Sequence, residues 1–267
     1  MSVALGQLAE LVSSGAVRVP PYPACALKLQ GVLASEDYTT NDLVHAMEAD
    51  PVFAANLLRL SNSPYYRRAA EVTSLQMAVQ RVGSKELVRL AMATSVASLA
   101  AADGPYFAVR RQVWRQALTS ALICDALSGL CGLAPAEAFL AGLLHDVGKL
   151  LVVGALEDLA VTADDNPAWW AVVERFHVHC GELLAQRWHL PGVLVTVITT
   201  HHDAPEALAP LPKLVHMADE VVALLEAETD VDEAALAGAG LTPALAQAVL
   251  RRVPEIPASL AAFERSQ

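Results

Sequence analysis

The chain has 267 residues, of which 54% are hydrophobic and 18% are charged, and its formal net charge is -11 at pH 7. This composition excludes a disordered chain, and the length allows one large domain or two small ones. The acidic balance argues against a nucleic-acid partner, because phosphates would be repelled and the densest basic cluster, residues 110–115, is too small to form a binding surface.

Signals for the start and end of helices recur through the first 100 residues. Asp50 precedes Pro51, which combines a capping side chain with a proline at the first helical position. Thr73 is expected to cap a helix that ends at Gly83, and Ser84 is expected to cap the helix that follows.

Residues 102–106 interrupt this helical pattern, because Gly104 and Pro105 disfavour a helix there. Beyond the interruption, the spacing of apolar residues predicts a helix from residue 109 to residue 130 that stops at Gly132.

Two later helix starts carry the same combination of cap and proline, at residues 166–167 and 242–243. No segment alternates strictly between polar and apolar residues and is bounded by hairpin turns. Apolar residues recur at helical spacing instead, and Ala and Leu are abundant. The sequence therefore predicts an all-α protein with roughly ten helices.

We divide the chain into three helical parts, which are residues 1–105, 106–229 and 230–267. The middle part contains seven of the eight histidines, whereas the last part offers no candidate chemistry. One continuous helical domain remains the alternative, because no repeat or low-complexity linker separates the parts.

Several features indicate a soluble, cytoplasmic protein without a membrane partner. The first 15 residues lack Lys and Arg and contain an acidic residue, so we do not expect a signal peptide. The longest apolar run, residues 90–101, is shorter than the roughly 18 residues that a membrane span requires. No C-x-x-C spacing occurs, and free thiols in a reducing compartment are expected for Cys25, Cys124, Cys131 and Cys180.

Histidines and aspartates on predicted helices form the most informative pattern. Taken singly, each is typical of a satisfied core or surface residue. Together they suggest a metal site, because neutral imidazoles and carboxylates are common ligands of divalent cations. A carboxylate on an apolar helix face is also costly to bury unless it is paired or bound to metal. The candidates are His145, Asp146, His177, His201, His202 and Asp219.

The stretches VPPYPACALKLQGVL, EADPVFAANLLRLSNSPYY and LLHDVGKLL resemble, in this order, the HDOD branch of the HD superfamily of metal-dependent phosphohydrolases. LLHDVGKLL resembles the HD-x-GK signature of the superfamily, and the other stretches match HDOD domains in the same order. The resemblance covers roughly residues 17–225. The HDOD-like stretches are VPPYPACALKLQGVL, EADPVFAANLLRLSNSPYY, VTSLQMAVQRVGSKELVRLAM, GELLAQRWHLP and VHMADEVV.

The resemblance implies an HD-superfamily helical bundle preceded by an N-terminal HDOD-type helical subdomain. It also implies that the six candidate residues named above are metal ligands. At the first ligand position, where the superfamily has a His or an acid, this chain has Gln116, which is a weak neutral ligand. The segment that handles cyclic dinucleotides in the related HD-GYP phosphodiesterases is not visible after His202.

Two functions from different classes follow from the resemblance. The first is a non-catalytic regulatory module of bacterial signal transduction that acts through a protein partner, as a monomer or a homodimer. The alternative is a metal-dependent phosphohydrolase or phosphodiesterase, in which Lys149 would contact the phosphate. We favour the regulatory module because Gln116 replaces a ligand. We expect one divalent transition metal (Fe, Mn or Ni) or none.

Overall fold

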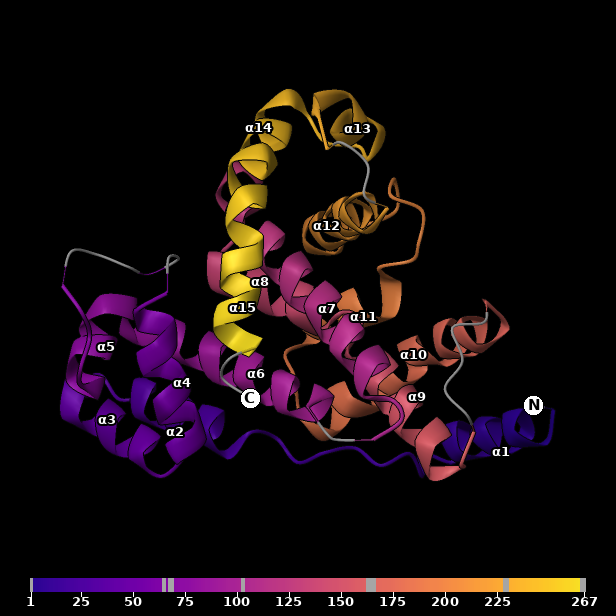
Figure 1. Ribbon diagram of the computed structural model, residues 1–267, viewed down its shortest axis with the longest axis horizontal. Helices are drawn as coiled ribbons and strands as arrows, with labels where there is room; N and C mark the ends of the chain where they lie inside the picture. Colours follow the sequence, from indigo (N-terminus) through magenta and orange to yellow (C-terminus); the bar gives the residue numbers. More distant parts are fainter. Residues whose placement is uncertain are drawn as a thin grey trace. The chain divides into compact units, whose positions relative to one another are not determined.

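The computed structural model describes residues 2–63, 66, 70–101, 104–161, 167–227 and 231–264. Every regular element within these ranges is a helix, which confirms the all-α prediction (Figure 1). The helices outnumber the roughly ten expected, because short capped helices give little periodic signal. Two of these are α3, Thr40–Glu48, capped by Thr39, and α13, Glu233–Gly238, capped by Asp232.

The chain divides into two compact units. The three parts expected from sequence, residues 1–105, 106–229 and 230–267, remain a prediction. The histidine unit comprises Met1–Pro21 and Leu99–Ala248, and the companion unit comprises Tyr22–Ser98 and Val249–Gln267. Most of the companion unit is formed by α2 (Ala24–Leu33), α3, α4 (Pro51–Ser61), α5 (Leu75–Val82), α6 (Ser84–Ala100) and α15 (Ile256–Glu264).

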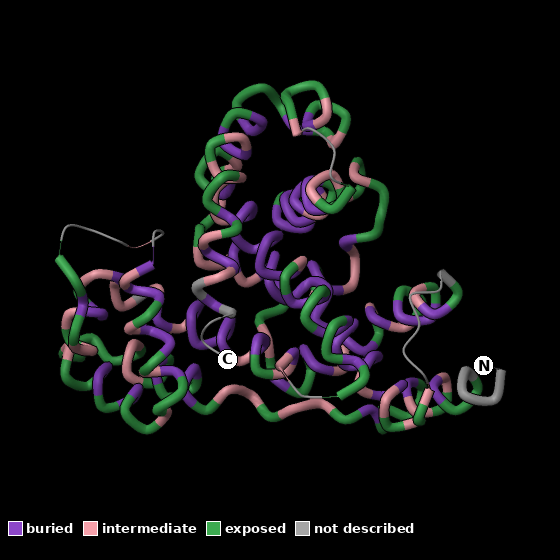
Figure 2. The backbone as a smooth tube through the Cα atoms, viewed as in Figure 1, coloured by how far each residue is buried: buried purple, intermediate pink, exposed green. Residues whose placement is uncertain are grey.

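The histidine unit contains the longest helices and all the candidate ligands. Its helices are α1 (Ser2–Ser13), α7 (Phe107–Ser128), α8 (Pro135–Leu144), α9 (Val147–Asp158), α10 (Pro167–Arg187), α11 (Gly192–Thr200), α12 (Pro210–Glu226), α13 and the part of α14 (Pro243–Arg252) up to Ala248. The residue that precedes Pro167 lies outside the described residues. Much of α7, α8 and α12 is buried, so these helices form the core around which the site is built (Figure 2).

Local capping fixes the helix ends in the companion unit. Asp50 caps α4 as expected, because its carboxylate accepts a hydrogen bond from the backbone N–H of Phe53 at 3.0 Å. The expected cap at Thr73 is wrong by one residue. Ser74 is extended and accepts from the N–H of Met77, three residues on, which is the reach of an N-cap side chain.

The junction between α5 and α6 also differs from the sequence prediction. Gly83 ends α5 with a φ of 93°, a value that glycine adopts without strain. Ser84 is the first residue of α6 rather than its cap, and its hydroxyl hydrogen-bonds that of Tyr38 at 2.9 Å.

Helix α7 begins two residues earlier than predicted and ends at Ser128. A short 3-10 helix, Gly129–Cys131, continues it and accounts for the longer helix expected from sequence. Gly132, with a φ of 68°, then ends the helical path as expected.

Helices α8 and α9 form the apolar centre of the histidine unit. By length and composition alone, Pro135–Asp158 could cross a membrane, but 83% of its most apolar window is buried inside the unit, as in a core helix.

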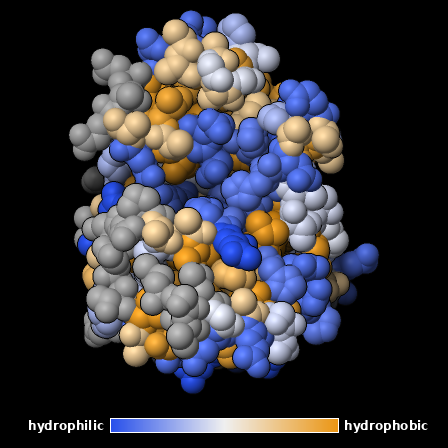
Figure 3. All heavy atoms as spheres, turned by 90° about the vertical axis from the view of Figure 1, so that its right-hand side faces the viewer, coloured by the Kyte–Doolittle hydropathy of each residue, from blue (hydrophilic) through white to orange (hydrophobic). Residues whose placement is uncertain are grey.

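On the face drawn in Figure 3, hydrophobic residues are interspersed with hydrophilic ones.

Two glycines allow neighbouring helices to approach α8 and α9 closely. A Cβ added at Gly142 would lie 2.8 Å from the backbone of Ala121 on α7. A Cβ added at Gly148 would lie 1.9 Å from the carbonyl oxygen of His177 and 2.5 Å from the nitrogen of Gly181, both on α10. Backbone atoms cannot move aside as a flexible side chain can. These positions therefore require glycine for packing.

Gly148→Ala is expected to destabilise the protein by about 3 kcal/mol or more, because the added methyl group overlaps the backbone of α10. Gly154→Ala, on the same helix but in open space, is the matched control and should stabilise by about 0.5–1 kcal/mol. Denaturant unfolding of both variants tests the difference. Equal stabilities would show that the α9–α10 contact is looser than described.

The cysteines are free thiols, as expected, and three of them are buried. Burial raises the pKa of Cys25 and of Cys180 to about 12, and it also raises the pKa of Cys124. Cys131 is partly exposed.

A disulfide reagent at pH 8 should therefore label Cys131 first in the native protein, because the thiolate is the reactive form and access is required. The other three thiols should react only after denaturant is added. Mass spectrometry of the labelled peptides checks this order, and early labelling of Cys124 or Cys180 would contradict the burial.

Candidate metal centre

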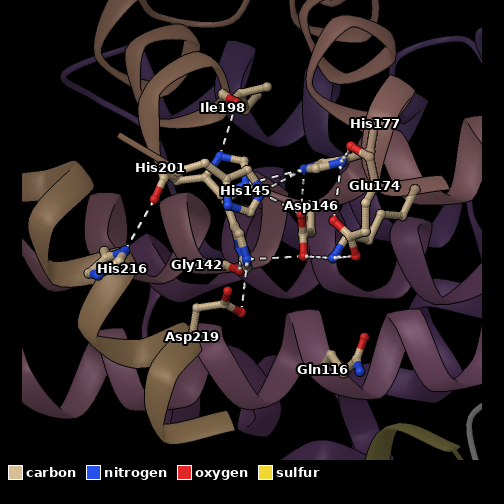
Figure 4. Close-up of polar contacts among 12 residues, drawn as sticks. Gln116, Gly142, His145, Asp146, Glu174, His177, Ile198, His201, His216 and Asp219 are labelled. Atoms are coloured by element: carbon tan, nitrogen blue, oxygen red, sulfur yellow. Dashed lines mark hydrogen bonds and ion pairs between the residues drawn. The ribbon is translucent and has the colours of Figure 1, made fainter. Parts of the chain in front are cut away.

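The six candidate ligands come from four places in the histidine unit and converge on one site (Figure 4). His145 ends α8, and Asp146 is the residue that precedes α9. The other four side chains come from α10, from the end of α11 and from α12. His177 lies within α10, His201 and His202 follow the last residue of α11, and Asp219 lies within α12.

A break in the helical path presents the His145–Asp146 pair to the site. Asp146 has φ and ψ of -106° and 9°, so it leaves the helical conformation between α8 and α9. Its carbonyl oxygen accepts a hydrogen bond from the N–H of Lys149 at 2.9 Å, which starts α9 at once. Two adjacent side chains can therefore face the same centre.

Backbone carbonyls orient three of the imidazoles in the same way. The Nδ1–H groups donate to Gly142 O at 2.8 Å for His145, to Glu174 O at 2.7 Å for His177, and to Ile198 O at 3.0 Å for His201. In the neutral ring this places the lone pair on Nε2, which faces the cluster (Figure 4). Each ring is thus prepared to act as a ligand.

A first group of ligand atoms surrounds one oxygen of Asp146. Its Oδ1 lies 3.3 Å from His177 Nε2 and 3.4 Å from His201 Nε2, and His202 Nε2 lies 3.0 Å from His177 Nε2. Burial lowers the pKa of His177, and burial together with the neighbouring imidazoles lowers the pKa of His202 to about 4. Asp146 Oδ1 and the Nε2 atoms of His177 and His201 are acceptors, and three acceptors so close together would repel one another unless they share a cation.

A second group surrounds the other oxygen of Asp146. His145 Nε2 lies 3.4 Å from Asp146 Oδ2 and 3.5 Å from Asp219 Oδ1. Burial alone would lower the pKa of His145, but the two carboxylates outweigh it and raise the pKa to about 10. Lys149 Nζ already lies 2.8 Å from Asp146 Oδ2. A positive charge therefore sits beside this group without any metal.

The first group fits a metal ion better than the second. It offers three imidazole nitrogens and one carboxylate oxygen, all within 4.8 Å of one another, a donor set that suits a first-row transition metal. The second group offers three ligand atoms, and the ammonium of Lys149 competes for one of them. The residues present thus fit one metal ion, held by Asp146, His177, His201 and His202.

Gln116 contributes no ligand to either group. Its side-chain amide on α7 donates to both carboxylate oxygens of Glu226, near the end of α12, at 2.8 Å. No dashed line joins Gln116 to the other residues drawn in Figure 4. At the position expected for the first ligand, the Gln116 side chain therefore joins α7 to α12 instead of facing the cluster.

Lys149, which was expected to contact phosphate, is buried and pairs with two carboxylates of the protein instead. Its ammonium lies 2.8 Å from both Asp146 Oδ2 and Glu174 Oε1. Sequence reasoning missed Glu174, although its position three residues before His177 places both side chains on one face of α10. It also missed His216, whose Nδ1–H donates to the carbonyl oxygen of His201 at 3.3 Å.

A family model of the HDOD domain matches residues 19–204, so the chain belongs to the HDOD family. An uncharacterized protein from Treponema pallidum (strain Nichols) is 25% identical over 244 residues, which are 85% of this chain and 47% of that protein. This chain therefore spans about half the length of that curated relative.

Two solved structures share the fold over nearly the whole chain. One, from Shewanella amazonensis SB2B and provisionally described as a phosphohydrolase, is 27% identical with a TM-score of 0.69, covering 97% of this chain and 98% of that chain. An HDOD domain protein from Geobacter sulfurreducens is 23% identical with a TM-score of 0.72, covering 100% and 99%. The HDOD resemblance expected from sequence is confirmed.

His177→Ala should lower the affinity for a divalent transition metal by at least about 100-fold, because even outer partners of metal ligands are worth 10–100-fold. His179→Ala is the matched control, since His179 lies on the same helix and pairs with Glu182 at the surface. Metal analysis after dialysis, combined with calorimetric titration, measures both. We expect at most one equivalent in the wild type, and two equivalents would refute the single site.

Proposed function

We propose that this chain is an HDOD regulatory module of signal transduction that holds one divalent metal ion and does not hydrolyse phosphate esters. The observation that carries the proposal is the pairing of Lys149 with Asp146 and Glu174 at the side of the cluster. A phosphate ester needs a cationic group to neutralise its charge, and two carboxylates already neutralise this one.

A bound metal ion would supply Lewis-acid chemistry and lower the pKa of a coordinated water. The contacts of the chain's own residues support binding of the ion rather than hydrolysis of a substrate. Asp146 contacts imidazoles with one oxygen and Lys149 with the other, which fixes its carboxylate. Gln116, tied to Glu226, leaves the first-ligand corner without a donor.

A rigid metal centre can serve regulation because it connects three parts of one unit. The ligands link the α8–α9 junction with α10 and with the end of α11, so binding of an ion favours one arrangement of these helices. A signalling protein that contacts this unit could then distinguish the metal-bound from the metal-free form. Such a partner, action in the cytoplasm and a homodimer remain parts of the proposal.

A metal-dependent phosphohydrolase is the second candidate, and one observation favours it. His202 is exposed and the side chain of Asp219 is 42% exposed, so solvent reaches the edge of the cluster. The relative from Shewanella amazonensis that is 27% identical is itself provisionally described as a phosphohydrolase. The two candidates differ in whether a substrate can displace the internal partners of Lys149.

Purified protein is expected to show no metal-dependent hydrolysis of cyclic dinucleotides or nucleoside monophosphates with Mn, Fe, Mg or Ni. The reason is that Lys149 is internally paired and Gln116 is not a ligand. Product formation by liquid chromatography measures turnover. The control is the double variant His145→Ala with Asp146→Ala. Turnover that is present in the wild type and absent in the double variant would establish the enzyme instead.

A further inference from the structure

The ammonium of Lys149 lies between two carboxylates of unequal exposure. Its Nζ is 2.8 Å from Asp146 Oδ2 and 2.8 Å from Glu174 Oε1. The side chains of Lys149 and Asp146 are 11% and 6% exposed, whereas that of Glu174 is 45% exposed. Glu174 is therefore the partner that solvent reaches, and it is the one that an incoming ligand could replace.

Glu174 is held in place by the same helix contact that forms the metal centre. Gly148 lets α10 approach α9, which brings Glu174 within reach of Lys149. On α10, the Nδ1 of His177 lies 2.7 Å from the backbone oxygen of Glu174 and 3.5 Å from its Oε2. The ring that faces the cluster through Nε2 thus supports Glu174 on its other side.

The charges around Lys149 explain what Glu174 does to an anion. Asp146, Asp219 and Glu174 each carry a negative charge close to the cluster. At the ammonium of Lys149, the carboxylates of Asp146 and Glu174 each lie 2.8 Å from Nζ, so a phosphate group meets little attraction there. Removing the charge of Glu174 leaves the ammonium with one carboxylate partner instead of two, and in a partly buried site one unit charge changes the attraction strongly.

We propose that Glu174 is an internal occupant of an oxyanion subsite on Lys149, so that a phosphate-class dianion binds there only when the carboxylate of Glu174 is displaced or neutralised. Carboxylate and phosphate oxygens both accept hydrogen bonds from an ammonium, so one can replace the other. The inference rests on the proposed function because it takes the cluster as a metal centre that lacks turnover. Glu174 acts through Lys149 and is a specificity-determining residue.

The test is titration of the full chain, loaded with one equivalent of Mn2+, with inorganic phosphate in a calorimeter. Glu174→Gln should bind phosphate at least about tenfold more tightly than the wild type, because it keeps the shape of the side chain and removes one unit charge near the ammonium. Glu182→Gln is the matched control. It lies on the same helix in a similar pair with His179, at 3.8 Å and away from Lys149, and it should match the wild type.

A further variant assigns the gain to the ammonium. Lys149→Met in the Glu174→Gln background should abolish the gain, and a gain that persists would overturn the proposal. Equal phosphate affinity in Glu174→Gln and Glu182→Gln would overturn it as well. If the double variant does not fold, as judged by circular dichroism, the phosphate affinities of Glu174→Gln and Glu182→Gln still decide whether Glu174 blocks the subsite.

Metal content and phosphodiester turnover, measured on the same samples, separate the two hypotheses. Normal metal content without turnover, together with unchanged phosphate affinity in Glu174→Gln, would refute the role of Glu174 and leave the regulatory module standing. Turnover by the wild type would refute the regulatory module, and the comparison of phosphate affinity in Glu174→Gln and Glu182→Gln would then decide the occupied subsite by itself.

Discussion

The candidate site depends on the close approach of α9 and α10 at Gly148. No side chain separates the two backbones there, since even a methyl group would overlap the carbonyl oxygen of His177. This approach sets His177 against Asp146 and Glu174 against Lys149. A single glycine therefore controls both the ligand geometry and the charge balance. Because glycine costs helix stability, its presence here is explained by packing.

The cluster is also preorganised by hydrogen bonds that lie within its own helices. Each of the three oriented imidazoles donates to a carbonyl three residues earlier in the chain. Ring orientation is thus set by local hydrogen bonds, whereas tertiary packing brings the helices together. The two oxygens of Asp146 then divide the site into a group that fits a metal ion and a group that contains the ammonium of Lys149.

The family of the chain and the geometry of its site bear on one question, which is how this chain relates to the HD phosphohydrolases. The fold and the buried His/Asp cluster relate the chain to HD phosphohydrolases. Under the proposed function, the contacts of Gln116 and Lys149 are what separate this chain from an enzyme that needs a complete ligand set and a cation open to phosphate.

The sequence by itself determined the all-α class, the HDOD family, the start of α4, the ends of α5 and α7 to within a few residues, and the six converging side chains. These features follow from helical periodicity, capping and motif order, which are local. Only the tertiary structure decided the Lys149–Glu174 pair and the Gln116–Glu226 contact, which join residues 25 and 110 positions apart. Such pairs depend on how closely helices cross. That distance is set by packing at residues such as Gly148, which no local pattern encodes.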